Sequence, residues 1–195
     1  MRTLTTCLST WMPALGLAAA LAAAPLTAAQ AASFVVDFSN IDSVDERGAA
    51  DNVTLSFTLG AGAFVTGFSW DVEVTAHSPS WLSELTLDFS NSSGEGVVFS
   101  PAGEADAPGS FSSAGHLDLL NSGFAFRLRP DGKLLLEFHD WYDDAPGLAD
   151  GRWNSGTLRF DYVSAVPEPA SYAMFALGLL AVGAARLRRR ATTTH

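Results

Sequence analysis

The chain has a single cysteine, Cys7, among its 195 residues. Cys7 precedes the apolar core of an N-terminal segment that has the pattern of a removable export signal. Once this segment is removed, the chain contains no disulfide, no thiolate nucleophile and no cysteine metal ligand. Disulfide-stapled folds, cysteine hydrolases and cysteine zinc sites are therefore excluded for the mature protein.

Basic residues are also scarce, and their distribution is uneven. Five of the eleven Lys and Arg residues lie at the two ends of the chain: Arg2, Arg186, Arg188, Arg189 and Arg190. The portion that contains all twenty-one acidic residues, from Asp37 to Glu168, has only the other six, so it carries a net charge of −15. This charge argues against nucleic acid and anionic lipid headgroups as partners. It favours cations, or simply a soluble exported surface.

Residues 1–31 have the pattern of a secretory signal peptide. Arg2 forms a short basic region, residues 14–24 form an alanine- and leucine-rich core, and Ala29-Gln30-Ala31 matches the A-x-A cleavage site. Cleavage is therefore predicted before Ala32, with Ala29 and Ala31 as the recognised residues.

The C-terminal end has a second signal, built of three parts in a fixed order. Val166-Pro167-Glu168-Pro169 comes first, residues 170–185 are apolar, and an arginine-rich end follows at 186–195. Each proline fixes its own φ and disfavours helix in the residue before it, so the tetrapeptide is predicted to be extended and accessible. This order resembles the PEP-CTERM sorting domain of bacterial exported proteins. The resemblance implies that exosortase, an integral membrane protease or transpeptidase, recognises and cuts the tail.

The apolar segment 170–185 is predicted to be a transmembrane helix. Its sixteen residues span roughly 24 Å as a helix, somewhat less than the ~30 Å of a hydrocarbon core. The positive-inside rule retains the arginines that follow (Arg186, Arg188, Arg189 and Arg190) in the cytoplasm. The protein is thus expected to be anchored in the inner membrane before processing and to reach the cell surface or the extracellular space afterwards.

Between the two signals, residues 32–165 have the length of one domain. Apolar side chains alternate with polar ones in seven segments: 34–38, 53–59, 68–74, 85–89, 124–128, 134–138 and 158–162. This period predicts half-buried strands, and no helical period appears between them. The fold is therefore predicted to be all-β, an antiparallel β-sandwich of jelly-roll type. The polar, glycine-rich segments 90–96 and 102–115 are predicted to be loops.

One local contact is predicted from turn chemistry. Pro130-Asp131-Gly132 favours a tight turn, because proline presets the first corner and glycine tolerates positive φ. Residues 124–129 and 133–140 are accordingly expected to pair as a hairpin.

The sequence gives little support for an enzyme. It contains neither G-x-S-x-G nor H-E-x-x-H, and His77, His116 and His139 have no catalytic partner by spacing. His77 lies in a turn and His139 falls on the outward phase of its strand, so both are predicted to be surface residues. A pair of carboxylates for glycoside hydrolysis could still be present among so many acidic residues. No catalytic residue is therefore assigned.

The segment 140–150 is the one internal cluster with possible binding chemistry. Its aspartates (Asp140, Asp143, Asp144 and Asp150) could supply oxygen ligands for calcium, although an ordinary solvated acidic loop explains them as well. Trp141, Tyr142 and Trp153 flank the same loop and could hold a sugar, or pack in the core instead. No other cofactor is expected.

These patterns predict an exported, exosortase-sorted surface or matrix protein with a non-catalytic structural or interaction role. The first alternative is a carbohydrate-binding module, with or without calcium, whose partner would be exopolysaccharide. The second is a hydrolase acting on matrix polymers.

Overall fold

A computed structural model describes residues 30–164 and 177–182. Ala28–Val166 forms one compact unit, and outside it only residues 177–182, which are helical, are described. Within the described ranges no helix is long and apolar enough to cross a membrane. Most of the predicted span 170–185, the sorting tetrapeptide 166–169, the arginines at 186–190 and Ala29 lie outside the described residues.

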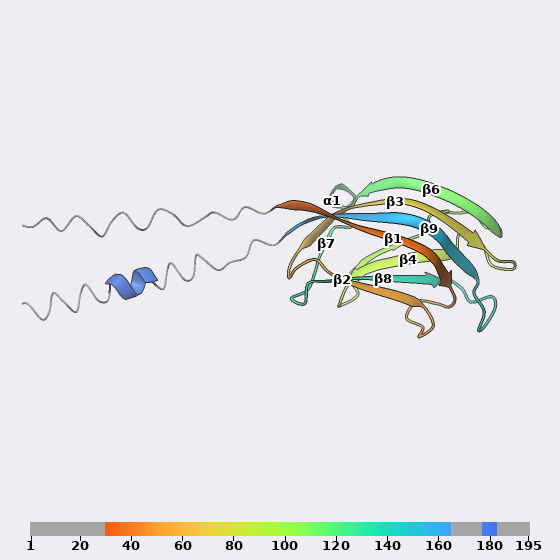
Figure 1. Ribbon diagram of the computed structural model, residues 1–195, viewed down its shortest axis with the longest axis horizontal. Helices are drawn as coiled ribbons and strands as arrows, with labels where there is room; N and C mark the ends of the chain where they lie inside the picture. Colours follow the sequence, from red (N-terminus) through yellow and green to blue (C-terminus); the bar gives the residue numbers. More distant parts are fainter. Residues whose placement is uncertain (1–29, 165–176, 183–195) are drawn as a thin grey trace, which may run out of the picture. The chain divides into compact units, whose positions relative to one another are not determined.

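The compact unit consists of two antiparallel sheets packed face to face (Figure 1). The first sheet contains, in spatial order, β1 (Ala31–Ser43), β9 (Gly151–Val163), β3 (Phe64–Ala76) and β6 (Gly109–Asp118), and the short β7 (Phe126–Arg127) also pairs with β3. The second contains β2 (Val53–Thr58), β8 (Lys133–Asp140), β4 (Leu85–Asn91) and β5 (Gly96–Phe99). A single turn of helix, α1 (Leu119–Ser122), follows β6. The predicted all-β sandwich is confirmed.

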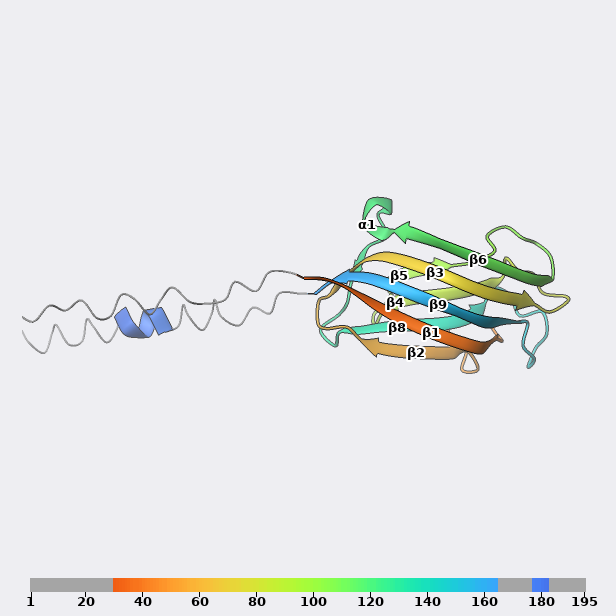
Figure 2. The same cartoon turned by 45° about the horizontal axis from the view of Figure 1, so that its top comes forward.

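The order of the strands is that of a jelly roll. Apart from the two-residue β7, there are eight strands: the first, eighth, third and sixth form one sheet, and the second, seventh, fourth and fifth form the other. Such an order arises from two interlocked Greek keys. Figure 2 shows the two layers from the side of the first sheet.

The core lies between the sheets and is centred on aromatic rings. Phe68 of β3 lies 4.5 Å from Phe89 of β4 and 5.3 Å from Phe160 of β9, measured between ring centroids, and all three are fully buried. These residues occupy the inward phase of their strands, as the alternating pattern predicts. Burial of each such side chain stabilises the fold by about 1.5 to 3 kcal/mol.

The predicted hairpin of residues 124–129 with 133–140 is wrong. The turn itself forms, since the Gly132 N–H donates to the Arg129 carbonyl at 2.8 Å. However, β7 pairs with β3 in the first sheet, whereas β8 lies between β2 and β4 in the second. The turn therefore carries the chain from one sheet to the other. Burial explains this outcome, because Phe126 and Leu134 both face the core, from opposite sheets.

Two strands and a helical turn were not predicted. β5 begins at Gly96, where the predicted loop 90–96 ends, and β6 takes up the second half of the predicted loop 102–115. Most of β6 is exposed, so it lacks the apolar alternation that marks a half-buried strand. Helix α1 is stabilised locally, because the Asp118 carboxylate accepts the Asn121 N–H at 2.9 Å and Gly123 ends it with a φ of 79°.

The chain enters and leaves the sandwich at the same end. Ala31 at the start of β1 pairs with Val163 at the end of β9, and the Ser164 N–H donates to the Gln30 carbonyl at 3.0 Å. Both figures show the loops that follow β3 and β8 at the other end. β9 has 13 residues, so the two ends are roughly 40 Å apart.

Candidate functional site

Two loops meet at the end of the sandwich that lies away from the chain termini. Residues 77–84 connect β3 to β4, and residues 141–150 connect β8 to β9. The His77 N–H donates to the Asp150 carbonyl at 2.7 Å, and the Trp141 N–H donates to the Glu84 carbonyl at 2.8 Å. Since both strand ends are fixed by sheet pairing, these bonds hold the two loops side by side.

The two loops expose three large aromatic side chains, which we call the aromatic end: Trp81, Trp141 and Tyr142. Their exposed fractions are 44%, 65% and 59%, whereas most aromatic rings of the domain are buried or half-buried. Trp141 and Tyr142 were predicted as ligand-binding residues, and the structure places both at the surface. Trp81 was not predicted. It directly follows the turn Ser78-Pro79-Ser80 and has no alternating apolar neighbours, so the sequence did contain a signal for an exposed aromatic.

Trp153 does not belong to this surface, and its prediction as a ligand-binding residue is wrong. Its indole is fully buried in the core, and its ring centroid lies 5.3 Å from that of Phe138 and 6.0 Å from that of Phe38. Trp153 is separated from the loop by Gly151 and Arg152, and it already occupies the inward phase of β9. The packing alternative is therefore correct for this residue.

Buried carboxylates lie beneath the aromatic end. Asp140 is fully buried, and its Oδ1 accepts the main-chain N–H groups of Trp141 at 2.9 Å and Tyr142 at 3.5 Å. Asp150 is 1% exposed, and its Oδ2 accepts the Asp144 N–H at 3.2 Å. These two aspartates, one at each end of the loop, thus restrain its backbone at residues 141, 142 and 144.

The environment of these carboxylates favours their neutral forms. Burial raises the pKa of Asp140 to about 7, against the lowering effect of the N–H groups that it accepts, and the charges of Asp150 and Glu84 raise it further. Burial also raises the pKa of Asp150 and of Glu84. No Arg or Lys side chain forms an ion pair with any of the three in the described part of the chain.

The four aspartates predicted to bind calcium are not arranged as a metal site. Asp143 and Asp144 are half-buried, and the Asp143 Oδ1 accepts the Ala145 N–H at 3.2 Å within the loop. Throughout residues 30–164 and 177–182, no three His, Cys, Asp or Glu side chains are placed together to hold a metal ion. The alternative, a solvated acidic loop, does not describe Asp140 and Asp150 either, because both are buried and bind main-chain N–H groups of the loop.

A small hollow of about 240 Å³ lies beside Trp141 on the outer face of the second sheet. The loop between β1 and β2 forms part of it and contributes Glu46 and Arg47. This loop is fixed by Arg47, whose guanidinium lies 2.8 Å from the buried carboxylate of Asp88, and by the parallel bridge between Glu46 and Asp140. Charged and hydrogen-bonding groups thus stand next to one of the exposed tryptophans.

The prediction that His139 is a surface residue is wrong. This residue does lie on the outward phase of β8, but it is only 1% exposed. Its Nδ1 lies 2.9 Å from the Asp140 carbonyl and 3.0 Å from the Thr86 hydroxyl. Strand period fixes which face a residue is on, whereas a loop that covers this face cannot be inferred from the period. His77, in contrast, is exposed as predicted.

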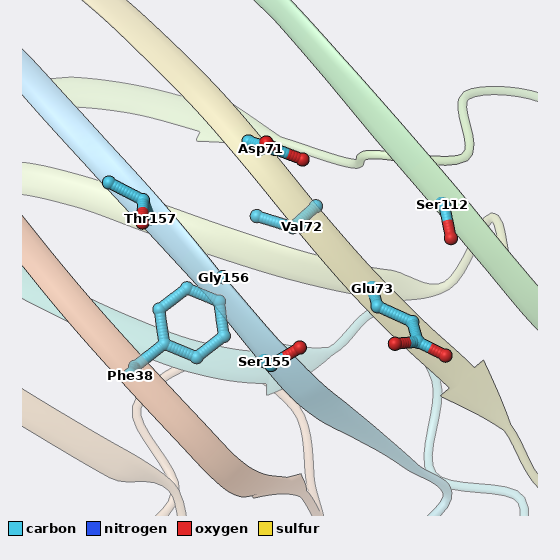
Figure 3. A pocket seen from close by; sticks show the side chains of 8 residues that line it. All are labelled: Phe38, Asp71, Val72, Glu73, Ser112, Ser155, Gly156 and Thr157. Carbon is cyan, nitrogen blue, oxygen red and sulfur yellow. The ribbon is translucent and has the colours of Figure 1, made fainter.

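A larger and more open hollow, of about 460 Å³, lies on the outer face of the first sheet (Figure 3). Its floor is Gly156, where a Cβ atom would come within 2.7 Å of the Asp71 carbonyl and 2.8 Å of the Phe38 ring. Carboxylates and hydroxyls surround this floor, contributed by Asp71, Glu73, Ser112, Ser155 and Thr157. Figure 3 shows these side chains spread over three neighbouring strands. The hollow thus has mostly polar walls, and the half-buried ring of Phe38 is the one aromatic side chain among its lining residues.

One serine–histidine pair also lies on this face. Ser69 of β3 and His116 of β6 are cross-strand neighbours, and the Ser69 hydroxyl lies 2.9 Å from the His116 Nδ1. The nearby carboxylate of Asp161 accepts hydrogen bonds from Ser33 at 2.7 Å and Arg159 at 3.1 Å. Among the described residues, no carboxylate hydrogen-bonds the imidazole to orient it as a general base.

Comparison with known families concerns the C-terminal tail. Residues 165–190 match the model of the PEP-CTERM protein-sorting motif. The chain carries a PEP-CTERM tail. No curated protein and no solved structure matches the chain, and no family covers its remainder. The motif implies an exported protein that is anchored in the membrane before cleavage and that has exosortase as its processing partner.

Proposed function

We propose that the mature protein is a non-catalytic binding component of the cell surface or extracellular matrix and that it binds carbohydrate through the aromatic end. The observation that carries this proposal is the exposure of Trp81, Trp141 and Tyr142 on two loops held together by backbone hydrogen bonds. The polypeptide that leads to the sorting motif leaves from the other end of the sandwich, at Ser164. The aromatic end is therefore not obstructed by the point of attachment.

Carbohydrate is the class of ligand that this chemistry suits. Exposed indole and phenol rings cover the apolar C–H faces of a sugar, and adjacent charged groups bind its hydroxyls. Arg47 and Glu46 provide such groups in the hollow beside Trp141. A strongly acidic domain with 20 acidic and 6 basic residues between 30 and 164 repels polyanions, so a neutral or cationic exopolysaccharide is the expected partner.

Two features support a binding role over hydrolysis. The Ser69–His116 pair is exposed on an open sheet face, and the acidic residues Asp140 and Asp150 are buried under main-chain groups that they bind. A hydrolase requires its nucleophile or carboxylate pair to face a substrate cleft. The hollow at Gly156 is the place where a hydrolase activity would be sought.

A glycan array with residues 32–165 tests the proposal. The triple variant Trp81→Ala/Trp141→Ala/Tyr142→Ala should lose at least about tenfold in affinity for the glycans that the native domain binds, since each stacked ring contributes on the order of 1 kcal/mol. Phe124→Ala is the matched control, because Phe124 is an equally exposed aromatic residue at another place. The proposal fails if the native domain binds no glycan or if the triple variant binds as well as the native domain. Parallel arrays with a calcium chelator should give the same result.

A further inference from the structure

Strand β6 is an unprotected edge of the first sheet. It pairs with β3 on one side, and no described residue pairs with it on the other. Seven of its ten residues are exposed, so no loop covers it. In an edge strand about half of the backbone N–H and C=O groups point away from the sheet, and here they are open to a further strand.

The other free edges are each limited by a feature that β6 lacks. β2 has six residues and β5 has four. β1 is long, but it carries Asp37 and Asp42 and is interrupted at Asn40, whose φ is 53°. From residue 109 to residue 115, β6 contains only Gly, Ser, Phe and Ala, and its register with β3 is regular throughout. Charges, prolines and bulges are the devices that normally prevent edge-to-edge pairing.

We propose that β6 is a self-association surface, at which β6 of a second copy of this chain adds antiparallel and joins two first sheets into one. A two-fold axis pairs an edge with itself, so one self-complementary strand is sufficient. This inference goes beyond carbohydrate binding and does not depend on it.

Charge selects β6 as the place at which two copies of the chain can meet. Two domains of net charge −14 each repel one another over most of their surfaces, which leaves an uncharged strip as the contact with the least repulsion. Asp118 lies at the end of β6, three residues beyond this strip, and Asp71 and Glu73 lie one strand away on β3. In the paired sheet the two β3 strands would be three strand spacings apart, about 14 Å, beyond the ~8 Å Debye length at physiological salt.

Partly exposed apolar groups on the inner side of this edge would also be covered. Phe111 is 39% exposed although it lies on the inward phase, and Trp70 passes so close under Gly115 that a Cβ there would meet its ring at 2.5 Å. The Trp70 indole N–H donates to Ser113 of β6 at 2.9 Å. Packing of a second strand against β6 would bury these groups further and so favour association.

The geometry of such a pair has a functional consequence. Because the two β6 strands run in opposite directions, the aromatic ends of the two copies would face opposite ways. If the aromatic end binds carbohydrate, the pair becomes a bivalent cross-linker of matrix chains, with an avidity above that of either site.

Single-cysteine variants test the pairing directly, because residues 32–165 contain no cysteine. Ser110→Cys, Ser112→Cys and Ala114→Cys place thiols along β6, and Val35→Cys and Ser39→Cys place them at exposed positions of the β1 edge as matched controls. Under mild oxidation, at least one β6 variant should give a disulfide-linked dimer, since a disulfide requires Cα atoms within about 7 Å of one another. Neither β1 control should do so at the same rate.

Sedimentation of the native domain provides the second measurement. The native domain should dimerise in a concentration-dependent way, more tightly at higher salt, and Ser112→Lys/Ala114→Lys should weaken the dimer at least about tenfold. Val35→Lys/Ser39→Lys should leave it unchanged. A native domain that stays monomeric at high concentration and salt, or lysines that act equally at both edges, would overturn the proposal. Failure of the glycan array would leave this result unaffected, so the two proposals are tested separately.

Discussion

The main-chain carbonyl of Glu84 accepts the main-chain N–H of Trp141 at 2.8 Å. The side chain of the same glutamate accepts the N–H of Trp81 at 2.7 Å. Glu84 therefore fixes the backbones of two exposed tryptophans that are 60 positions apart in the sequence. This residue of the loop before β4 thus links the two loops of the aromatic end, together with Asp140, which also accepts the Trp141 N–H.

Replacement of Glu84 should loosen Trp81 without unfolding the domain. Glu84→Ala removes the acceptor of the Trp81 N–H, whereas Glu84→Gln retains an oxygen that can accept it. The Trp81 amide should exchange with solvent faster in the alanine variant and at a near-native rate in the glutamine variant, as hydrogen exchange can measure. Equal exchange in both variants would show that the side-chain bond does not restrain Trp81.

Core and surface tryptophans should differ sharply in their effect on stability. Trp153→Ala removes a fully buried indole and should lower the free energy of unfolding by about 3 to 5 kcal/mol. Trp141→Ala removes a side chain that is 65% exposed and should change it by less than about 0.5 kcal/mol. Urea unfolding of the two variants gives the comparison. A large loss in Trp141→Ala would mean that its ring packs on the domain.

The domain should become less stable as the pH rises from 5 to 8. Asp140 has a pKa of about 7 in the folded state, and its ordinary value of 3.8 applies in the unfolded state. Between these values the unfolded chain releases a proton that the folded chain retains, so the free energy of unfolding falls as pH rises and levels off above about pH 7. The expected loss is roughly 1 to 3 kcal/mol. The raised pKa values of Asp150, Glu84 and Asp88 act in the same direction.

Thermal melting across this pH range provides the measurement, with Asp140→Asn as the test. The amide cannot ionise, so the variant should show a smaller decrease between pH 5 and pH 8. Asp51→Asn, in an exposed loop, is the control and should retain the native slope. Asp118 and Asp161, whose pKa values are lowered by hydrogen bonds to their carboxylates, contribute only at acid pH. A slope that Asp140→Asn leaves intact would assign the effect to other groups.

The ion pair of Arg47 with Asp88 should matter more than an exposed one. Asp88 is buried, so Arg47→Ala leaves its charge without a partner and should cost about 1 to 3 kcal/mol. Arg129→Ala breaks the pair with Glu95, which joins two half-exposed side chains at 3.5 Å, and should cost less than about 0.5 kcal/mol. Asp88→Asn in the Arg47→Ala background should restore part of the loss. Chemical unfolding of the three variants decides whether the loop between β1 and β2 depends on this pair.

The sequence predicted the features that depend on the alternation of side chains along a strand. It did not predict those that depend on which strands pair with one another. Alternation placed Phe68 and Phe160 correctly in the core, because burial of one strand face is a local pattern. It paired Phe126 with the wrong neighbour, because a tight turn can join two sheets as well as two strands of one sheet. It missed most of β6, since an exposed edge strand needs no apolar alternation.

The candidate site was predicted in part for a similar reason. Trp141 and Tyr142 lie in a loop that composition marks clearly, and they are exposed. Trp153 is two residues inside the following strand, where its phase is inward, so only the strand boundary separates it from the loop. Trp81 joins the site through a loop 60 positions away, and a single sequence carries no signal for that contact.

Processing of the tail should depend on the residues of the PEP-CTERM motif. Glu168 stands between two prolines, which favour an extended backbone, so we expect its side chain to be accessible to a membrane protease. In an exosortase-bearing host, mass spectrometry of the native secreted protein should find a start near Ala32 and no Arg186–Arg190 segment. Glu168→Ala should leave a longer form in the membrane fraction, with Glu104→Ala, in a surface loop, as the control that is released normally. Native protein that retains its arginines would contradict exosortase processing, and normal release of Glu168→Ala would show that this glutamate is not recognised.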